Sequence, residues 1–344
     1  MRKLLNTLYV NTQGAYLHRD GETVSVKIDN EVRLRVPVHT LEGLVCFGQV
    51  SCSPPLLGMC AEHQVGVSFM SEHGRFLARV QGPVSGNVLL RRQQYRVADD
   101  EAASLPIVVA IVAAKIANSR NVLLRGAREA KGESCQSILR EAAEQVGRAG
   151  ERACRAKNID QARGCEGEAA QIYFGVFHEL IGGEPGAFEF KGRSRRPPLD
   201  NVNALLSFVY ALLTHDVRSA LEAVGLDPAV GFLHTDRPGR PSLALDLMEE
   251  LRPQLADRLV LTLINRRQLN ASGFEQQQAG GVQMTEATRK EVIMAWQKRK
   301  QEDIEHPFLD ERIPLGLVPH AQALLLARHI RGGLDGYPPF LWRG

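Results

Sequence analysis

Hydrophobic and polar residues alternate along the first quarter of the chain. The segments 22–29 (ETVSVKID) and 31–38 (EVRLRVPV) have a two-residue period, which is typical of β-strands with one buried face. Asp29 and Asn30 lie at the junction of the two segments and predict the tight turn of a β-hairpin. Three more strand-length runs, bounded by Gly, Ser or His, occur at 44–51, 65–71 and 75–82. This part of the chain is therefore expected to be rich in β structure.

From about residue 105 the period of the apolar residues changes to steps of three and four, which predicts amphipathic helices. Seven segments have this pattern: 107–125, 137–157, 166–182, 201–225, 242–267, 285–303 and 318–334. The change of period near residues 93–104 predicts a domain boundary. The expected fold class is α+β multidomain, with a β-rich N-terminal domain at residues 1–98 followed by an all-α C-terminal domain at residues 99–344.

Composition narrows the class of protein. The 344 residues exceed what one hydrophobic core usually supports, and 44% hydrophobic with 24% charged residues is typical of a folded globular chain. The apolar run 105–117 is too short for a bilayer and contains Lys115, so it predicts a buried helix and no membrane association. Six cysteines without a CxxC pair favour reduced thiols and a cytoplasmic protein. A net charge of +3 requires no polyanionic partner by itself.

One short region of the C-terminal half combines a histidine with carboxylates. In 231–253 (GFLHTDRPGRPSLALDLMEELRP), His234 precedes a Pro/Gly/Arg loop, and a helical segment follows. Asp246 and Glu249 are three residues apart in that helix, so their side chains are neighbours and could bind a divalent cation with a third ligand. The alternative is that these carboxylates interact with the helix dipole and that His234 is a hydrogen-bonded loop residue.

Glu166 is a second candidate, because it lies on an apolar helix face. Ala170, Tyr173 and Phe177 follow it by four, seven and eleven residues and share that face. A carboxylate on a buried face is costly unless it is paired, protonated or bound to a metal. The alternative is a partly solvated glutamate near a helix start, stabilised by the helix dipole. The pattern alone leaves both interpretations open.

These segments together resemble the CRISPR-associated integrase family, the metal-dependent DNA endonucleases and integrases of spacer acquisition. The resemblance covers nearly the whole chain and depends on four motifs in order. They are IVAAKIANSRNVLLR (111–125), CEGEAAQIYF (165–174), DNVNALLSFVYALL (200–213), and GLDPAVGFLH with RPSLALDLMEELRP inside 225–253. The Gln-rich stretch 274–281 and the overall length resemble the type I-C branch of that family.

The resemblance implies a dimerising β-rich N-terminal domain and a catalytic helical C-terminal domain. It also implies a Mg²⁺ or Mn²⁺ site whose ligands, matched by position, are Glu166, His234 and Glu249. Asp246 matches a second acidic position in or beside the catalytic site. The choice of Glu249 over Glu250 comes from the resemblance, and the periodicity favours it only slightly.

The reaction implied by the family joins a protospacer 3′-OH to a phosphodiester at the leader–repeat boundary of the CRISPR array, by transesterification. The implied partners are double-stranded DNA, a second copy of the chain in a homodimer, and the small second CRISPR adaptation protein. DNA has to be held mainly through its phosphates. The segment KGRSRRPP (191–198) offers four basic side chains for this, Lys191, Arg193, Arg195 and Arg196.

Two other classes of protein fit part of the pattern. A DNA-binding architectural protein with a degenerate acidic site would bind DNA without metal and would transfer no strand. A metallohydrolase acting on a small substrate would have a closed pocket without a basic approach, and its activity would not depend on salt as DNA affinity does.

Overall fold

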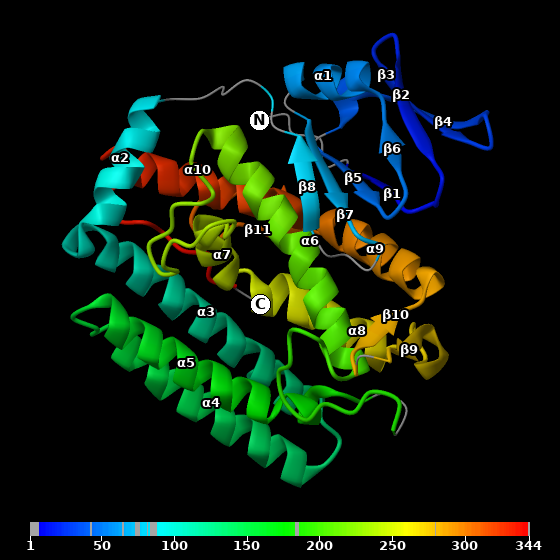
Figure 1. Cartoon of the computed structure of the whole chain (residues 1–344). Helices are drawn as coiled ribbons and strands as arrows, with labels where there is room; N and C mark the ends of the chain where they lie inside the picture. Colours follow the sequence, from blue (N-terminus) through cyan, green and yellow to red (C-terminus); the bar gives the residue numbers. More distant parts are fainter. Residues whose placement is uncertain are drawn as a thin grey trace. The chain divides into compact units, whose positions relative to one another are not determined.

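The computed structural model describes residues 7–41, 43–63, 65–72, 76–80, 82, 88–182, 186–278 and 280–342, apart from the side chain of Phe76. The chain forms two compact units, Met1–Gly86 and Asn87–Gly344 (Figure 1). The sequence placed the boundary between residues 98 and 99. The structure divides earlier because helix α2 (Val88–Asp99) packs against α3 and α10 of the second unit.

The first unit contains two four-stranded sheets among its described residues. One sheet has the order β1 (Thr7–Val10), β5 (Gly43–Phe47), β7 (Gly66–Met70) and β8 (Phe76–Val80), with only β8 antiparallel to its neighbour. The other has the order β4 (Glu31–Pro37), β3 (Thr23–Ile28), β2 (Tyr16–Asp20) and β6 (Ser51–Cys52). Helix α1 (Pro54–Glu62) is capped by the Ser53 hydroxyl. Both sheets and α1 contribute to one buried core that includes Leu17, Leu44 and Leu56.

The predicted hairpin is confirmed. Strands β3 and β4 pair antiparallel, and Asp29 and Asn30 both have positive φ angles, 51° and 64°. A pair of left-handed residues matches the twist of the flanking strands, and Asn and Asp tolerate this conformation better than other non-glycine residues.

The second unit is mainly helical. Its helices are α3 (Glu101–Glu129), α4 (Glu133–Ala153), α5 (Ile159–Gly175), α6 (Asn201–Val224), α7 (Ser242–Glu249), α8 (Arg258–Asn265), α9 (Glu286–Lys300) and α10 (Val318–Ile330). Two short hairpins are also present, β9 (Phe274–Gln276) with β10 (Val282–Met284), and β11 (Asp303–Glu305) with β12 (Arg312–Pro314). The expected all-α domain did not include these hairpins, because three-residue strands are too short to show a periodic pattern.

Helix α3 is the central element of this unit, with α4 and α5 packed alongside it (Figure 1). By length and apolar composition it could cross a membrane, but half of its most apolar window is buried inside the fold. The predicted buried helix is therefore present. Asp100 caps its first turn by accepting hydrogen bonds from the backbone N–H groups of Ala102 and Ala103.

The segment 242–267, expected to be one helix, is divided into three parts. Helix α7 ends at Glu249, the π-helical segment Arg252–Asp257 follows, and α8 continues from Arg258. Pro253 lies at the start of the π-helical segment and has no N–H to donate to the preceding turn, so the regular α-helix is interrupted there.

Candidate metal centre and basic cleft

Glu166 lies in the middle of α5. The helix begins at Ile159, where the side chain of Asn158 accepts a hydrogen bond from the Gln161 N–H. Glu166 is therefore two turns inside the helix, and the dipole of a helix start does not account for it. Its side chain is 22% exposed and contacts the ammonium of Lys115 from α3.

The His234 loop is held by Asp246 of α7. One carboxylate oxygen, Oδ2, accepts the backbone N–H groups of Phe232 (2.6 Å) and Leu233 (2.9 Å). The other, Oδ1, accepts the backbone N–H of His234 (2.9 Å) and lies 2.7 Å from its ring Nδ1. A Cβ at position 231 would lie 2.8 Å from Oδ2, so glycine is needed for this close approach. Asp246 is fully buried and acts on the site by fixing the loop.

The contact with Asp246 also determines which nitrogen of His234 is available. A carboxylate oxygen can only accept, so Nδ1 carries the proton of that contact. In the neutral imidazole, Nε2 then has a free lone pair, and it faces Glu249 with 4.0 Å between Nε2 and Oε1. A histidine fixed through its other nitrogen by a carboxylate is the usual arrangement of a metal ligand.

Glu249 is the most enclosed acid of the candidate ligand set, with its side chain 4% exposed. Its Oε2 lies 2.6 Å from Nζ of Lys115, and its Oε1 lies 2.8 Å from Nη1 of Arg252. Burial opposes ionisation, but the charges of Arg252 and Lys115 outweigh it and lower the pKa of Glu249 to about 2. The carboxylate is therefore charged and able to bind a cation at neutral pH.

The neighbouring Glu250 points elsewhere. It accepts hydrogen bonds from the Tyr337 hydroxyl (2.5 Å) and the Phe340 N–H (3.0 Å), which belong to the C-terminal YPPFLW stretch. Asn118 of α3 donates to the backbone carbonyls of Glu250 and Phe340. Burial raises the pKa of Glu250 to about 7. The C-terminal stretch thus ties the end of α7 to α3 through Glu250, and of these two neighbouring glutamates only Glu249 contacts Lys115.

The three predicted ligands converge on one place. Glu166 and Glu249 contact the same nitrogen of Lys115, and His234 faces Glu249. Two carboxylates and a free imidazole nitrogen are a donor set that suits Mg²⁺ or Mn²⁺. Within the described part of the chain, no three such side chains already form a metal-binding cluster. A cation does lie between the two carboxylates, and it is the Lys115 ammonium.

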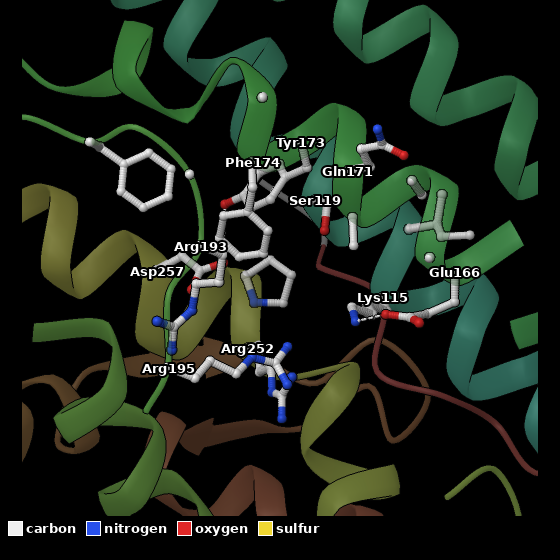
Figure 2. A pocket seen from close by; sticks show the side chains of 18 of the residues that line it. Lys115, Ser119, Glu166, Gln171, Tyr173, Phe174, Arg193, Arg195, Arg252 and Asp257 are labelled. Atoms are coloured by element: carbon white, nitrogen blue, oxygen red, sulfur yellow. Dashed lines mark hydrogen bonds and ion pairs between the residues drawn. The ribbon is translucent and has the colours of Figure 1, made fainter. Parts of the chain in front are cut away.

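A cleft of about 910 Å³ leads from Lys115 and Glu166 along α5. Figure 2 shows Lys115 bound to Glu166, with Arg193, Arg195 and Arg252 also lining the cleft. Other parts of its wall are aromatic, formed by side chains that include Tyr173, Phe174, Phe190 and Tyr210. The cleft therefore joins an acidic end to positively charged and aromatic surfaces.

The four basic residues predicted from the 191–196 segment differ in their surroundings. Lys191, Arg195 and Arg196 are exposed. Arg193 is partly buried and donates to Asn203 Oδ1 (2.6 Å) and to Ser207 Oγ (3.2 Å) on α6. Its guanidinium also lies over the ring of Tyr210, 5.3 Å from the centroid. Arg193 therefore holds the loop against α6, while Arg195, Arg196 and Lys191, which pairs with Glu189 at 3.8 Å, are exposed to solvent.

Sequence reasoning missed the role of Lys115 and Arg252 as the counter-charges of the site. A signal was present for Lys115, which is the only charged residue between Glu101 and Arg120. Asp257 was also missed. It is buried, accepts hydrogen bonds from Tyr210 (2.6 Å) and Tyr173 (3.1 Å), and its pKa is raised by burial to about 6.

Comparison with known proteins identifies the class. The family described as "CRISPR associated protein Cas1" matches residues 8–298. The chain is 54% identical over 343 residues to the CRISPR-associated endonuclease Cas1 1 of Chlorobaculum tepidum, and the match covers 100% of both chains. These matches define the class as CRISPR-associated proteins. The chain belongs to the Cas1 family.

Two solved structures share the fold. A casposase bound to integration product has a TM-score of 0.83 and 20% identity, over 98% of this chain and 94% of that chain. A chain from a Cas6-RT-Cas1–Cas2 complex has a TM-score of 0.83 and 22% identity, over 99% of this chain and 36% of that one. The β-rich first part and the helical second part are thus the Cas1 fold. Its assignment to the type I-C branch stays a prediction.

Proposed function

We propose that this protein inserts spacer DNA into a CRISPR array by metal-dependent transesterification, and that the same site cleaves DNA when water is the nucleophile. The observation that supports this most directly is the convergence of Glu166 and Glu249 on one cation, with Nε2 of His234 facing Glu249. Asp246 holds the His234 loop so that this nitrogen faces inward.

The carboxylates of Glu166 and Glu249 and Nε2 of His234 would hold Mg²⁺ or Mn²⁺. Bound there, the ion would polarise the scissile phosphate and favour ionisation of the attacking 3′-hydroxyl. Arg195 and Lys191, exposed at the cleft, would hold backbone phosphates and so align the strand with the acidic end.

The proposed partners are double-stranded DNA, a second copy of the chain, and the small second CRISPR adaptation protein, all in the cytoplasm. Support for DNA and for the small adaptation protein comes from two proteins of the same fold, one bound to an integration product and one in a complex that includes Cas2. A small-substrate metallohydrolase is less consistent with a cleft lined by Lys191, Arg193 and Arg195.

The decisive test compares Glu166→Gln with Glu168→Gln. Both glutamates are on α5, but Glu168 is half-exposed and pairs with Arg152. Strand transfer of a 3′-OH oligonucleotide duplex into a supercoiled plasmid is measured with Mn²⁺ and with chelator, and DNA binding is measured by fluorescence anisotropy. Glu166→Gln is expected to lose strand transfer and keep DNA binding, and Glu168→Gln is expected to keep both.

Three outcomes would contradict the proposal. Strand transfer by wild-type protein in chelator would exclude metal dependence, and full activity of Glu166→Gln would exclude the assigned ligand. DNA binding without any strand transfer by the wild-type protein, with or without Mn²⁺, would favour the architectural alternative.

A further inference from the structure

Lys115 is an unusual residue for its position. It is the only charged residue in a stretch of α3 whose neighbours Ile111, Val112 and Ile116 are buried, and its own side chain is 12% exposed. An ammonium in such surroundings is costly unless it is paired. It is paired twice, with Glu166 of α5 and with Glu249 of α7. One cation therefore links the acids of two helices that are far apart in the sequence.

The charges of the four side chains in these ion pairs are balanced. Glu166 and Glu249 contribute two negative charges, and Lys115 and Arg252 contribute two positive charges. Arg252 binds Oε1 of Glu249, whereas Lys115 binds Oε2 of Glu249 and Oε1 of Glu166. A divalent ion held by these two carboxylates would need oxygens of the same two side chains, so the Lys115 ammonium and the ion would compete for Glu166 and Glu249.

We propose that Lys115 is a resident cation that keeps Glu166 and Glu249 together in the metal-free protein and gives up their oxygens when a divalent ion binds. This inference rests on the proposed function, because it requires those carboxylates to be metal ligands. Lys115 is a positioning residue in this scheme. Its ammonium balances the acids before the ion arrives and competes with the ion for them.

The substitution Lys115→Met tests the scheme because it removes the charge and keeps an unbranched apolar chain. The metal-free variant should unfold at a lower temperature than wild type, since Glu166 then loses the Lys115 ion pair and Glu249 keeps only the one with Arg252. Mn²⁺ should bind at least about tenfold more tightly and should raise the Tm of the variant more than that of wild type. Lys115→Arg keeps the charge and should restore the wild-type Mn²⁺ affinity.

Lys300→Met is the matched control. Lys300 is another nearly buried lysine, with a side chain 4% exposed, and it pairs with Asp216 at 2.9 Å. Its loss should lower Tm equally in chelator and in Mn²⁺ and leave Mn²⁺ affinity unchanged. Lys115→Gln serves as a second uncharged variant if Lys115→Met does not fold.

Affinity is measured by titration calorimetry of the full-length metal-free protein with Mn²⁺, and Tm by differential scanning fluorimetry. If the uncharged Lys115 variants bind Mn²⁺ as wild type does, or more weakly, the inference is overturned while the metal site stands. If wild type binds no Mn²⁺, or if Glu166→Gln binds it equally well, the proposed metal site fails and the inference fails with it.

Discussion

The substitution Asp246→Asn examines how much the site depends on one buried carboxylate. Asp246 accepts four N–H groups, three from the backbone of residues 232–234 and one from the ring of His234. Asparagine is nearly the same size, but only one of its two terminal groups accepts hydrogen bonds. Its NH₂ would face N–H donors where Asp246 has an accepting oxygen.

The cost can be worked from these four contacts. The remaining oxygen can keep two donors, and the other two lose their acceptor inside the fold. Leaving a buried donor unsatisfied costs about 1–3 kcal/mol, so Asp246→Asn should lower the free energy of unfolding by about 2–6 kcal/mol. This is a large part of the roughly 5–15 kcal/mol that stabilises a typical domain.

Metal affinity should fall as well, because Asp246 fixes the ring of His234. Loss of a carboxylate that orients a metal-ligating histidine typically costs about 10–100-fold in affinity. Asp216→Asn is the control, since Asp216 accepts from Trp296 and pairs with Lys300 outside the site. It should destabilise the fold and leave Mn²⁺ affinity unchanged.

Urea unfolding in chelator gives the stability of each variant, and titration calorimetry with Mn²⁺ gives its affinity. An Asp246→Asn protein with wild-type Mn²⁺ affinity would refute the role assigned to Asp246 in orienting His234. A variant with unchanged unfolding free energy would show that the loop does not need its four acceptor contacts.

Two further predictions concern Asp257 and the exposed arginines. Burial raises the pKa of Asp257 to about 6 from 3.8, so its contribution to stability is complete below pH 3.8 and is lost as pH rises through 6. Asp257→Asn should remove about 3 kcal/mol of this pH dependence from the free energy of unfolding measured in urea. If the unfolding free energy of the variant depends on pH as that of wild type does, the raised pKa of Asp257 is refuted. The double variant Arg195→Ala/Arg196→Ala should weaken DNA binding and lower the slope of log affinity against log salt by about two, with Mn²⁺ affinity unchanged. An unchanged salt slope would exclude these two side chains as phosphate contacts.

The parts of the fold that follow from local sequence were predicted well. Strands β3 and β4 follow one another in sequence, and the two residues of the turn between them have the positive φ angles that the hairpin requires. The long helices follow from apolar periodicity in the same way. Strand β1 was missed because it is four residues long and pairs with β5, some 36 positions away, which no local pattern reports.

The site shows a different limit of sequence reasoning. Spacing showed that Asp246 and Glu249 are neighbours on a helix, but not which way each points. Asp246 faces the His234 loop and Glu249 faces α3 and α5. The direction depends on where α7 packs, and that is set by its contacts with α6, α3 and α10 and by contacts from the far C-terminus to Glu250. The three candidate ligands could therefore be matched only through the family resemblance.

Charge balance explains why the remaining members of the site are basic. Glu249 is almost fully enclosed, and an enclosed carboxylate requires compensating positive charge close by. Arg252 supplies part of it from the π-helical segment that follows α7, three residues later, whereas Lys115 comes from α3, more than a hundred residues earlier. The first could be inferred from helical spacing and the second could not. A lone lysine in an apolar helix indicates a buried acid, and only the fold identifies that acid as a residue of the candidate metal site.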